Sequence, residues 1–175
     1  MKTKPILLYV LLAAFLAGCS SSGQFRSEAG RFSVKAPAAL KEQPQSTDTS
    51  GGKIEAHTFL VEKNNITYVV AYTDFQEQTV NSGDPQTLLN NARDSMIGSL
   101  SGFLLQENIA TVNNYPGREL SVAYTMPDGK TGVLMARVYL VKTRLYQVMT
   151  MSSDANYKDP SIAKFLDSFK LTGTP

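Results

Sequence analysis

The chain has 175 residues, with 17 basic and 15 acidic side chains, one histidine and one cysteine. This length fits a single domain, and the near balance of charges excludes a strongly basic nucleic-acid-binding protein. A lone cysteine excludes a disulfide within the chain, and a lone histidine excludes a metal centre built from several histidines.

The N-terminal residues have the pattern of a segment that is cleaved off after export. Lys2 and Lys4 precede an apolar run over residues 6–16, which is shorter than the roughly 20 residues that a transmembrane helix needs. The sequence Leu-Ala-Gly-Cys at residues 16–19 resembles the bacterial lipobox. This resemblance implies cleavage before Cys19 and attachment of a diacylglycerol and an N-acyl chain to that cysteine. We therefore predict a lipoprotein signal peptide over residues 1–18.

Cleavage would leave 157 residues with 15 basic and 15 acidic side chains, because Lys2 and Lys4 are removed. We expect the acyl chains on Cys19 to anchor the protein to a membrane. Residues 19–30 are small and polar and predict a flexible tether, and residues 31–175 predict one domain. We expect an exported protein on the periplasmic or outer side of the cell envelope. Ser20 after the cysteine resembles the enterobacterial-type sorting pattern, which implies an outer-membrane destination. The neutral domain has no polybasic attraction to anionic lipid.

The first half of the domain predicts three strands. Residues 31–35 alternate as a short strand, residues 38–52 are polar and predict an exposed loop, and residues 53–61 and 66–75 predict a hairpin. The second hairpin strand is apolar on both faces, which is typical of a strand covered on both sides.

The second half predicts two helices around four consecutive strands. Asp84-Pro85 and Asp159-Pro160 each place an N-cap before a proline at the first helical position. The strands between the helices are expected at residues 103–112, 118–125, 132–142 and 144–152. This order predicts an α+β fold, with an antiparallel sheet of about six to seven strands and two main helices packed on it.

Four short sequence segments resemble those of a known family. They are Phe-Ser-Val-Lys-Ala-Pro at residues 32–37, Tyr-Pro-Gly-Arg-Glu at 115–119, Arg-Leu-Tyr-Gln-Val at 144–148 and Lys-Phe-Leu-Asp-Ser-Phe-Lys at 164–170. Together with the order of elements, they resemble the PsbP-like fold of photosystem II extrinsic proteins. The resemblance implies an αβα sandwich that serves as a non-catalytic binding or assembly module. No residue matches a metal-binding or partner-binding motif of that family.

Arg137 is the most unusual residue, because it lies within the apolar run 133–141. A charge there is costly unless it is paired, and Glu119 on the neighbouring predicted strand is a suitable partner. Two readings remain open, an internal pair or the polar floor of a binding face. Tyrosine combines apolar area with a hydroxyl group, which suits either a core or an interface. The tyrosines nearest to such a face would be Tyr124, Tyr139 and Tyr146.

The other candidates favour structural roles. His57 lies in a predicted strand without a nucleophile-elbow sequence, and we expect a partly exposed strand residue. Asp154 with Asp159, or Glu77 with Asp84, could hold a hard cation, but helix capping accounts for Asp84 and Asp159. We therefore predict no catalytic residue, no metal and no cofactor.

Three functions remain under consideration. The leading hypothesis is a non-catalytic, membrane-tethered accessory or assembly lipoprotein that binds an unidentified partner protein and no nucleic acid. The second is a carrier for a lipid or another small apolar ligand held between sheet and helix. The third is an enzyme, which would require a cleft with converging polar groups.

Overall fold

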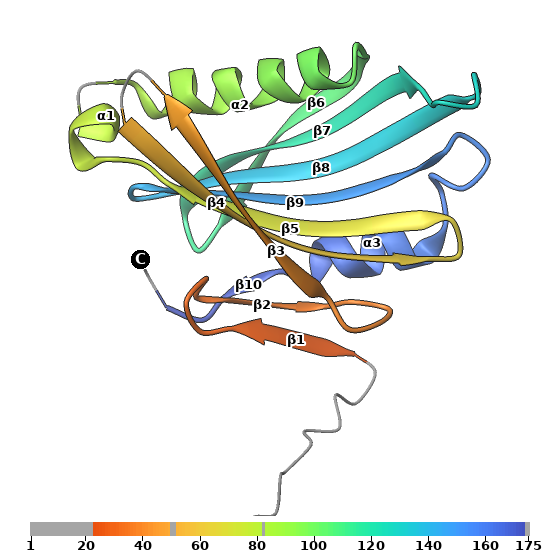
Figure 1. The fold of residues 1–175 in the computed structure, drawn as a ribbon, viewed down its shortest axis with the longest axis horizontal. Coiled ribbons are helices and arrows are strands. Elements are labelled where there is room, and N and C mark those ends of the chain that lie inside the picture. Colours follow the sequence, from red (N-terminus) through yellow and green to blue (C-terminus); the bar gives the residue numbers. More distant parts are fainter. Residues whose placement is uncertain (1–22, 50–51, 82, 174–175) are drawn as a thin grey trace, which may run out of the picture.

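The computed structural model describes residues 23–49, 52–81 and 83–173. Figure 1 shows three layers, with one helix above a large sheet and a helix and a small sheet below it. The predicted signal peptide and Cys19 lie outside the described residues. Within the described part of the chain, no helix has both the length and the apolar character needed to cross a bilayer.

The large sheet has seven strands in the order β3-β4-β5-β9-β8-β7-β6, and all its neighbouring strands are antiparallel. Its strands are β3 (Lys41–Thr49), β4 (Gly52–Lys63), β5 (Ile66–Asp74), β6 (Phe103–Val112), β7 (Tyr115–Thr125), β8 (Thr131–Val141) and β9 (Arg144–Ser153). The predicted α+β class and its antiparallel sheet are confirmed. β5 and β8 are buried on both faces along most of their length, as predicted for β5.

Tight turns set the register of three hairpins. Asn64 and Asn65 join β4 to β5, and Asn113 and Asn114 join β6 to β7; all four have positive φ. Asparagine tolerates this left-handed conformation, and two consecutive positive-φ residues match the twist of a two-residue hairpin. Lys142, between β8 and β9, also has a positive φ of 53°.

The helices are α1 (Glu77–Asn81), α2 (Pro85–Ser99) and α3 (Pro160–Asp167). The Asp84 carboxylate accepts a hydrogen bond from the Gln86 backbone nitrogen at 3.0 Å. Asp159 accepts one from the Ser161 backbone nitrogen at 2.8 Å. Both predicted N-caps are therefore confirmed, and α1 is an additional short helix.

The small sheet contains β1 (Gln24–Ser27), β2 (Phe32–Lys35) and β10 (Lys170–Leu171) in the order β1-β2-β10. The prediction of a flexible tether is therefore wrong for residues 24–30. Phe25, a large apolar residue in this otherwise polar stretch, packs against Phe32 and Phe59 at ring-centroid distances of 5.9 and 5.2 Å. Burial of this ring favours a strand that composition alone does not suggest.

The predicted loop over residues 38–52 is also wrong, because residues 41–49 form β3. β3 pairs antiparallel with β4 along its whole length, from Lys41 opposite Leu60 to Thr49 opposite Gly52. The polar composition gave no sign of a strand. An edge strand can be held by backbone hydrogen bonds to its neighbour alone and does not need apolar side chains.

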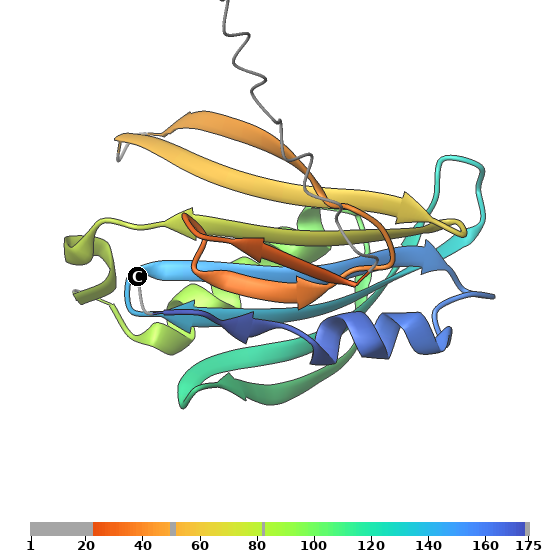
Figure 2. The same cartoon turned by 90° about the horizontal axis from the view of Figure 1, so that it is seen from below.

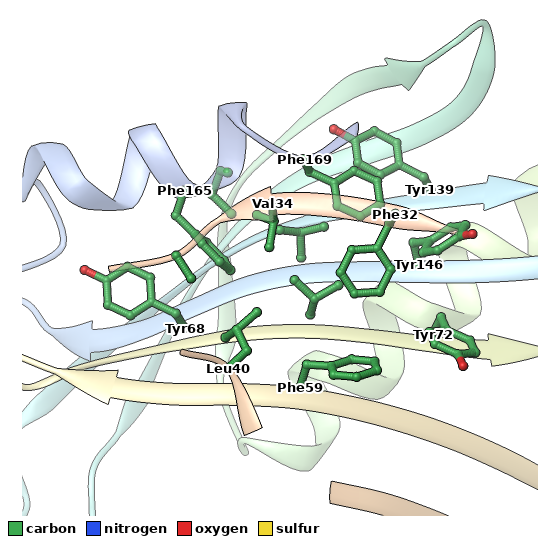
Figure 3. Packing of buried hydrophobic residues seen from close by; sticks show 14 of the residues in the cluster. Phe32, Val34, Leu40, Phe59, Tyr68, Tyr72, Tyr139, Tyr146, Phe165 and Phe169 are labelled. Atoms are coloured by element: carbon green, nitrogen blue, oxygen red, sulfur yellow. The ribbon is translucent and has the colours of Figure 1, made fainter. Parts of the chain in front are cut away.

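Two apolar clusters fill the spaces between the layers. One lies between α2 and the sheet, where Leu89, Ala92 and Met96 meet strands β7 and β8. The other lies between the sheet and the layer formed by α3 and the small sheet. Figure 2 shows this layer in front of the large sheet, and Figure 3 shows side chains of the cluster. Its labelled members in Figure 3 are Phe32, Val34, Leu40, Phe59, Tyr68, Tyr72, Tyr139, Tyr146, Phe165 and Phe169.

Candidate functional site

Arg137 lies at the centre of an ion-pair cluster on the α3 side of the sheet. It stands directly opposite Glu119 in the β7–β8 register, and its Nε is 2.7 Å from Glu119 Oε2. Its second contact comes from α3, where Asp167 Oδ1 is 2.6 Å from an Arg137 terminal nitrogen. The predicted Arg137–Glu119 pair is confirmed, and the tertiary structure adds Asp167.

The surroundings keep the Arg137 guanidinium charged. Partial burial acts to lower its pKa, but hydrogen bonds to Glu119 and Asp167 outweigh this effect and raise the pKa above its ordinary value. With two carboxylates already bound, Arg137 joins β8, β7 and α3. These two ion pairs explain why a charged residue occurs in this apolar strand: Arg137 links the sheet to α3.

The three predicted tyrosines do not form one surface. Tyr139 is 5% exposed and its ring stacks on Phe169 at 5.8 Å, while Tyr146 is fully buried and donates a hydrogen bond to the Gly30 carbonyl at 2.7 Å. Burial raises the pKa of both phenols. Tyr124 instead packs with the cluster beneath α2, on the opposite face of the sheet. The structure therefore groups Arg137, Glu119 and Tyr139, and separates Tyr124 from them.

A small hollow of about 220 Å³ opens beside Arg137. Arg137, Glu119 and Met135 line it from the sheet. The remaining lining comes from α3 and the residues before it, namely Tyr157, Lys158, Asp159, Pro160, Ile162, Ala163 and Leu166. Its polar lining therefore combines the Arg137–Glu119 pair with Lys158 and Asp159 from the residues before α3.

A larger groove of about 620 Å³ lies on the other side of α3, between this helix and the end of β2. It is lined by Lys35, Ala36, Pro37, Ser161, Lys164, Asp167, Ser168 and Lys170. The groove thus carries three ammonium groups and one carboxylate, and that carboxylate is engaged by Arg137. The sequence did not single out these lysines, because they come from three separate elements.

The serine hydroxyls of this groove serve the fold. Ser168 Oγ donates to the Phe165 carbonyl at 2.7 Å and accepts from the Lys35 backbone nitrogen at 2.8 Å. Ser161 Oγ lies 2.6 Å from the Tyr68 hydroxyl and donates to Asp159 at 2.6 Å. The lysines are consequently the groups that would attract an anionic surface or ligand.

The remaining predicted candidates have structural partners. His57 Nδ1 is 3.0 Å from Glu42 Oε1, and its ring stacks on Tyr72 at 4.7 Å. With 31% of its side chain exposed, His57 is the partly exposed strand residue that was predicted. Across residues 23–49, 52–81 and 83–173, no three His, Cys, Asp or Glu side chains lie close enough together to hold a metal ion.

Arg144 is an important residue that the sequence patterns did not reveal. It is 8% exposed, and its Nε and one terminal nitrogen contact the two Asp74 carboxylate oxygens at 2.6 Å each. Its other terminal nitrogen donates to the Ala29 carbonyl at 2.9 Å, and its guanidinium lies 4.2 Å from the Tyr72 ring centroid. Arg144 therefore ties β9 to β5 and to the turn between β1 and β2.

No family model matches the chain, and a search of curated proteins found no match. Solved structures do resemble it. Cyanobacterial PsbP (CyanoP) from Synechocystis sp. PCC 6803 matches with a TM-score of 0.56 and 9% identity, over 88% of this chain and 95% of that chain. A protein from Bacteroides thetaiotaomicron matches with a TM-score of 0.50 and 10% identity, over 86% of this chain and 48% of that chain.

LpqN of Mycobacterium tuberculosis, described as involved in cell envelope biogenesis, has a TM-score of 0.49 and 12% identity, over 82% of this chain and 83% of that chain. At such identities a structural likeness concerns the fold and not the activity. The agreement with CyanoP covers nearly the whole domain. The chain therefore has a PsbP-like α+β fold.

Proposed function

We propose that this protein is a non-catalytic, lipid-anchored accessory or assembly protein of the cell envelope that binds a partner protein close to the membrane. The observation that carries the proposal is the lipobox-like sequence ending at Cys19, followed almost at once by a folded PsbP-like domain. Two or more acyl chains give stable membrane anchoring.

The tether is shorter than its composition suggests. Because β1 begins at Gln24, five residue steps separate the anchor at Cys19 from the folded domain. A fully extended chain spans at most about 3.4 Å per residue, so this link reaches roughly 17 Å. A domain held this close has a high effective concentration toward membrane-bound partners, and a weak interface is then sufficient.

The groove beside α3 is the partner site that we favour. Gln24 stands opposite Lys35 in the β1–β2 register, so the chain enters the domain next to one end of this groove. Lys35, Lys164 and Lys170 favour an acidic surface on the partner. In the same region, Arg137 and the serines are engaged in contacts that support the fold, which favours a binding role over catalysis.

A small-ligand carrier is the second candidate, because about 620 Å³ lies within the range of ligand pockets. Its lining combines Ala36 and Pro37 with three lysines and an aspartate, which favours a ligand with an anionic group over a wholly apolar one. The space between sheet and α3 is also occupied by interlocking rings, such as Phe165 against Tyr68 at 5.2 Å. Native mass spectrometry of the purified protein would reveal a carried ligand as added mass.

Photo-crosslinking in the native membrane tests the partner proposal. A photoreactive amino acid at Lys164 should capture one specific protein, and Lys164→Glu with Lys170→Glu should weaken the complex about tenfold or more by charge reversal. The matched control is Lys130→Glu, because Lys130 is an exposed lysine on the β7–β8 turn, where Asp128 binds it. Equal loss with the control, or no capture at Lys164, would refute this site.

A further inference from the structure

The large apolar side chains that the described residues expose are gathered on one strand. Phe103 is 62% exposed, Leu104 37%, Leu105 53% and Ile109 83%, and all four belong to β6. Isolated exposed apolar residues are ordinary, but a contiguous group marks an interaction surface.

β6 is also an edge of the large sheet. Within the described residues it pairs only with β7, so the outer side of its backbone ladder is open (Figure 2). The opposite edge, β3, carries Pro44 and the charged residues Lys41, Glu42 and Asp48. Proline and charge are the usual protection of a sheet edge against pairing. β6 has no proline, and its only charged residue is Glu107.

That single charge is already balanced within its own chain. Glu107 Oε2 lies 2.9 Å from an Arg93 terminal nitrogen, and Glu107 Oε1 lies 3.0 Å from Arg118 Nε. Only 21% of the Glu107 side chain is exposed. A strand approaching β6 would therefore meet apolar side chains and free backbone groups without an unpaired charge.

The register of β6 makes this strand self-complementary. Glu107 stands opposite Leu120 of β7, Leu104 opposite Val122 and Ile109 opposite Arg118. The bulge between Leu104 and Gln106 takes up one extra residue, Leu105. Leu104 and Ile109 consequently lie equally far on either side of Glu107 and on the same face of the sheet.

The same symmetry holds on the other face. Phe103 stands opposite Ala123 and Ala110 opposite Gly117. Phe103 and Ala110 are therefore each three β7 positions from Glu107, on opposite sides of it. In a two-fold antiparallel pair centred on Glu107, Leu104 of one copy would face Ile109 of the other. Phe103 would face Ala110.

We propose that β6 pairs with β6 of a second copy of this chain, joining the two large sheets into one continuous sheet. Such a pairing is isologous, because the same residues contribute from both sides. The two Glu107 carboxylates would meet at the axis, where Arg93 and Arg118 from each copy offset their repulsion. Confinement to a membrane would favour this association, but the pairing itself does not depend on the lipid anchor.

The oligomeric state of the purified mature protein tests the pairing. Analytical ultracentrifugation should show a concentration-dependent dimer for the wild type. Ile109→Lys should raise the dimer Kd by roughly 100-fold, because the symmetric interface contains the substitution twice and each site costs about tenfold. Thr131→Lys, at an exposed position of β8, should leave the Kd unchanged, and thermal melts should show that both variants fold.

Disulfide trapping tests the register. In one chain, Leu104 and Ile109 lie four β7 positions apart, which is about 14 Å of strand and too far for an internal disulfide. A variant carrying both Leu104→Cys and Ile109→Cys should therefore form a covalent dimer on mild oxidation. The wild type controls for Cys19, and each single variant should stay monomeric on a non-reducing gel.

Three results would overturn the proposal. The first is a wild-type protein that stays monomeric up to about 100 μM, well above the micromolar Kd at the weak end of specific interfaces. The others are a dimer insensitive to Ile109→Lys and equal trapping of the single and double cysteine variants. A monomer that instead captures a different protein along β6 would also refute pairing with a second copy.

Discussion

Replacing Arg144 is the sharpest test of how the N-terminal strands are held to the main sheet. Arg144→Ala removes a bidentate pair with Asp74, a hydrogen bond to the Ala29 carbonyl and a cation–π contact with Tyr72. These three contacts join elements that are far apart in the sequence. We expect the variant to fold with a clearly lower free energy of unfolding.

The expected loss can be assembled from these contacts. The Asp74 side chain is 52% exposed, so solvent screening limits the ion pair to about 1 kcal/mol. The hydrogen bond to Ala29 contributes about 1 kcal/mol, and the cation–π contact contributes about 1 kcal/mol. Arg144→Ala should therefore lower the free energy of unfolding by about 3 kcal/mol. Arg144→Lys should lose roughly half as much, because it keeps the charge without the planar fork.

Urea denaturation followed by circular dichroism measures this loss. A double-mutant cycle with Asp74→Ala separates the ion pair from the other two contacts, and its coupling energy should be about 1 kcal/mol. Hydrogen exchange should show faster opening of residues 24–35 in Arg144→Ala, since the turn carrying Ala29 loses its donor. A loss below about 1 kcal/mol for Arg144→Ala would refute this reasoning, because a single one of the three contacts would then account for the whole effect.

Three other predictions concern the anchor, the backbone and pH. Cys19→Ser should abolish the lipid mass shift and move the protein from the membrane to the soluble fraction, and unchanged fractionation would contradict the lipoprotein assignment. Gly98→Ala should raise the free energy of unfolding by about 0.5–1 kcal/mol, because Gly98 is an exposed helical residue with open space where the added methyl group would lie. Gly117→Ala should lower it by more than 1 kcal/mol, since the added methyl would clash with the Val138 backbone carbonyl of β8. Equal melting temperatures for the two variants would refute the contrast. Burial raises the pKa of Tyr139 and Tyr146 above the ordinary value of 10.0, so the unfolded chain releases these protons first. Stability should fall as pH rises above 10, and Tyr146→Phe should show a shallower fall in urea titrations between pH 8 and 11.

Much of the fold could be predicted because its signals are local. Asp84 and Asp159 each precede a proline, and this N-cap pattern predicts the starts of α2 and α3. Near-continuous apolar runs predict β5 and β8, because a strand that is covered on both faces carries apolar residues at successive positions. The pairing of Arg137 with Glu119 could also be anticipated, because a charge in an apolar strand requires a partner on a neighbouring strand.

The missed elements have no local signal. β3 is polar and is held by its ladder with β4, and β1 depends on Phe25 reaching Phe32 and Phe59. Composition therefore classed both segments as flexible. Only the packing of distant residues decides whether such a segment is a strand.

The sequence by itself determined the helix starts and the antiparallel α+β class, because each depends on residues close together in the chain. The tertiary structure alone decided which charges meet, that the first strand already begins at Gln24, and where apolar side chains remain uncovered. Asp167 on Arg137, Asp74 on Arg144 and the exposed face of β6 all arise from long-range packing. These features depend on which strands lie side by side, and that order is a property of the whole sheet.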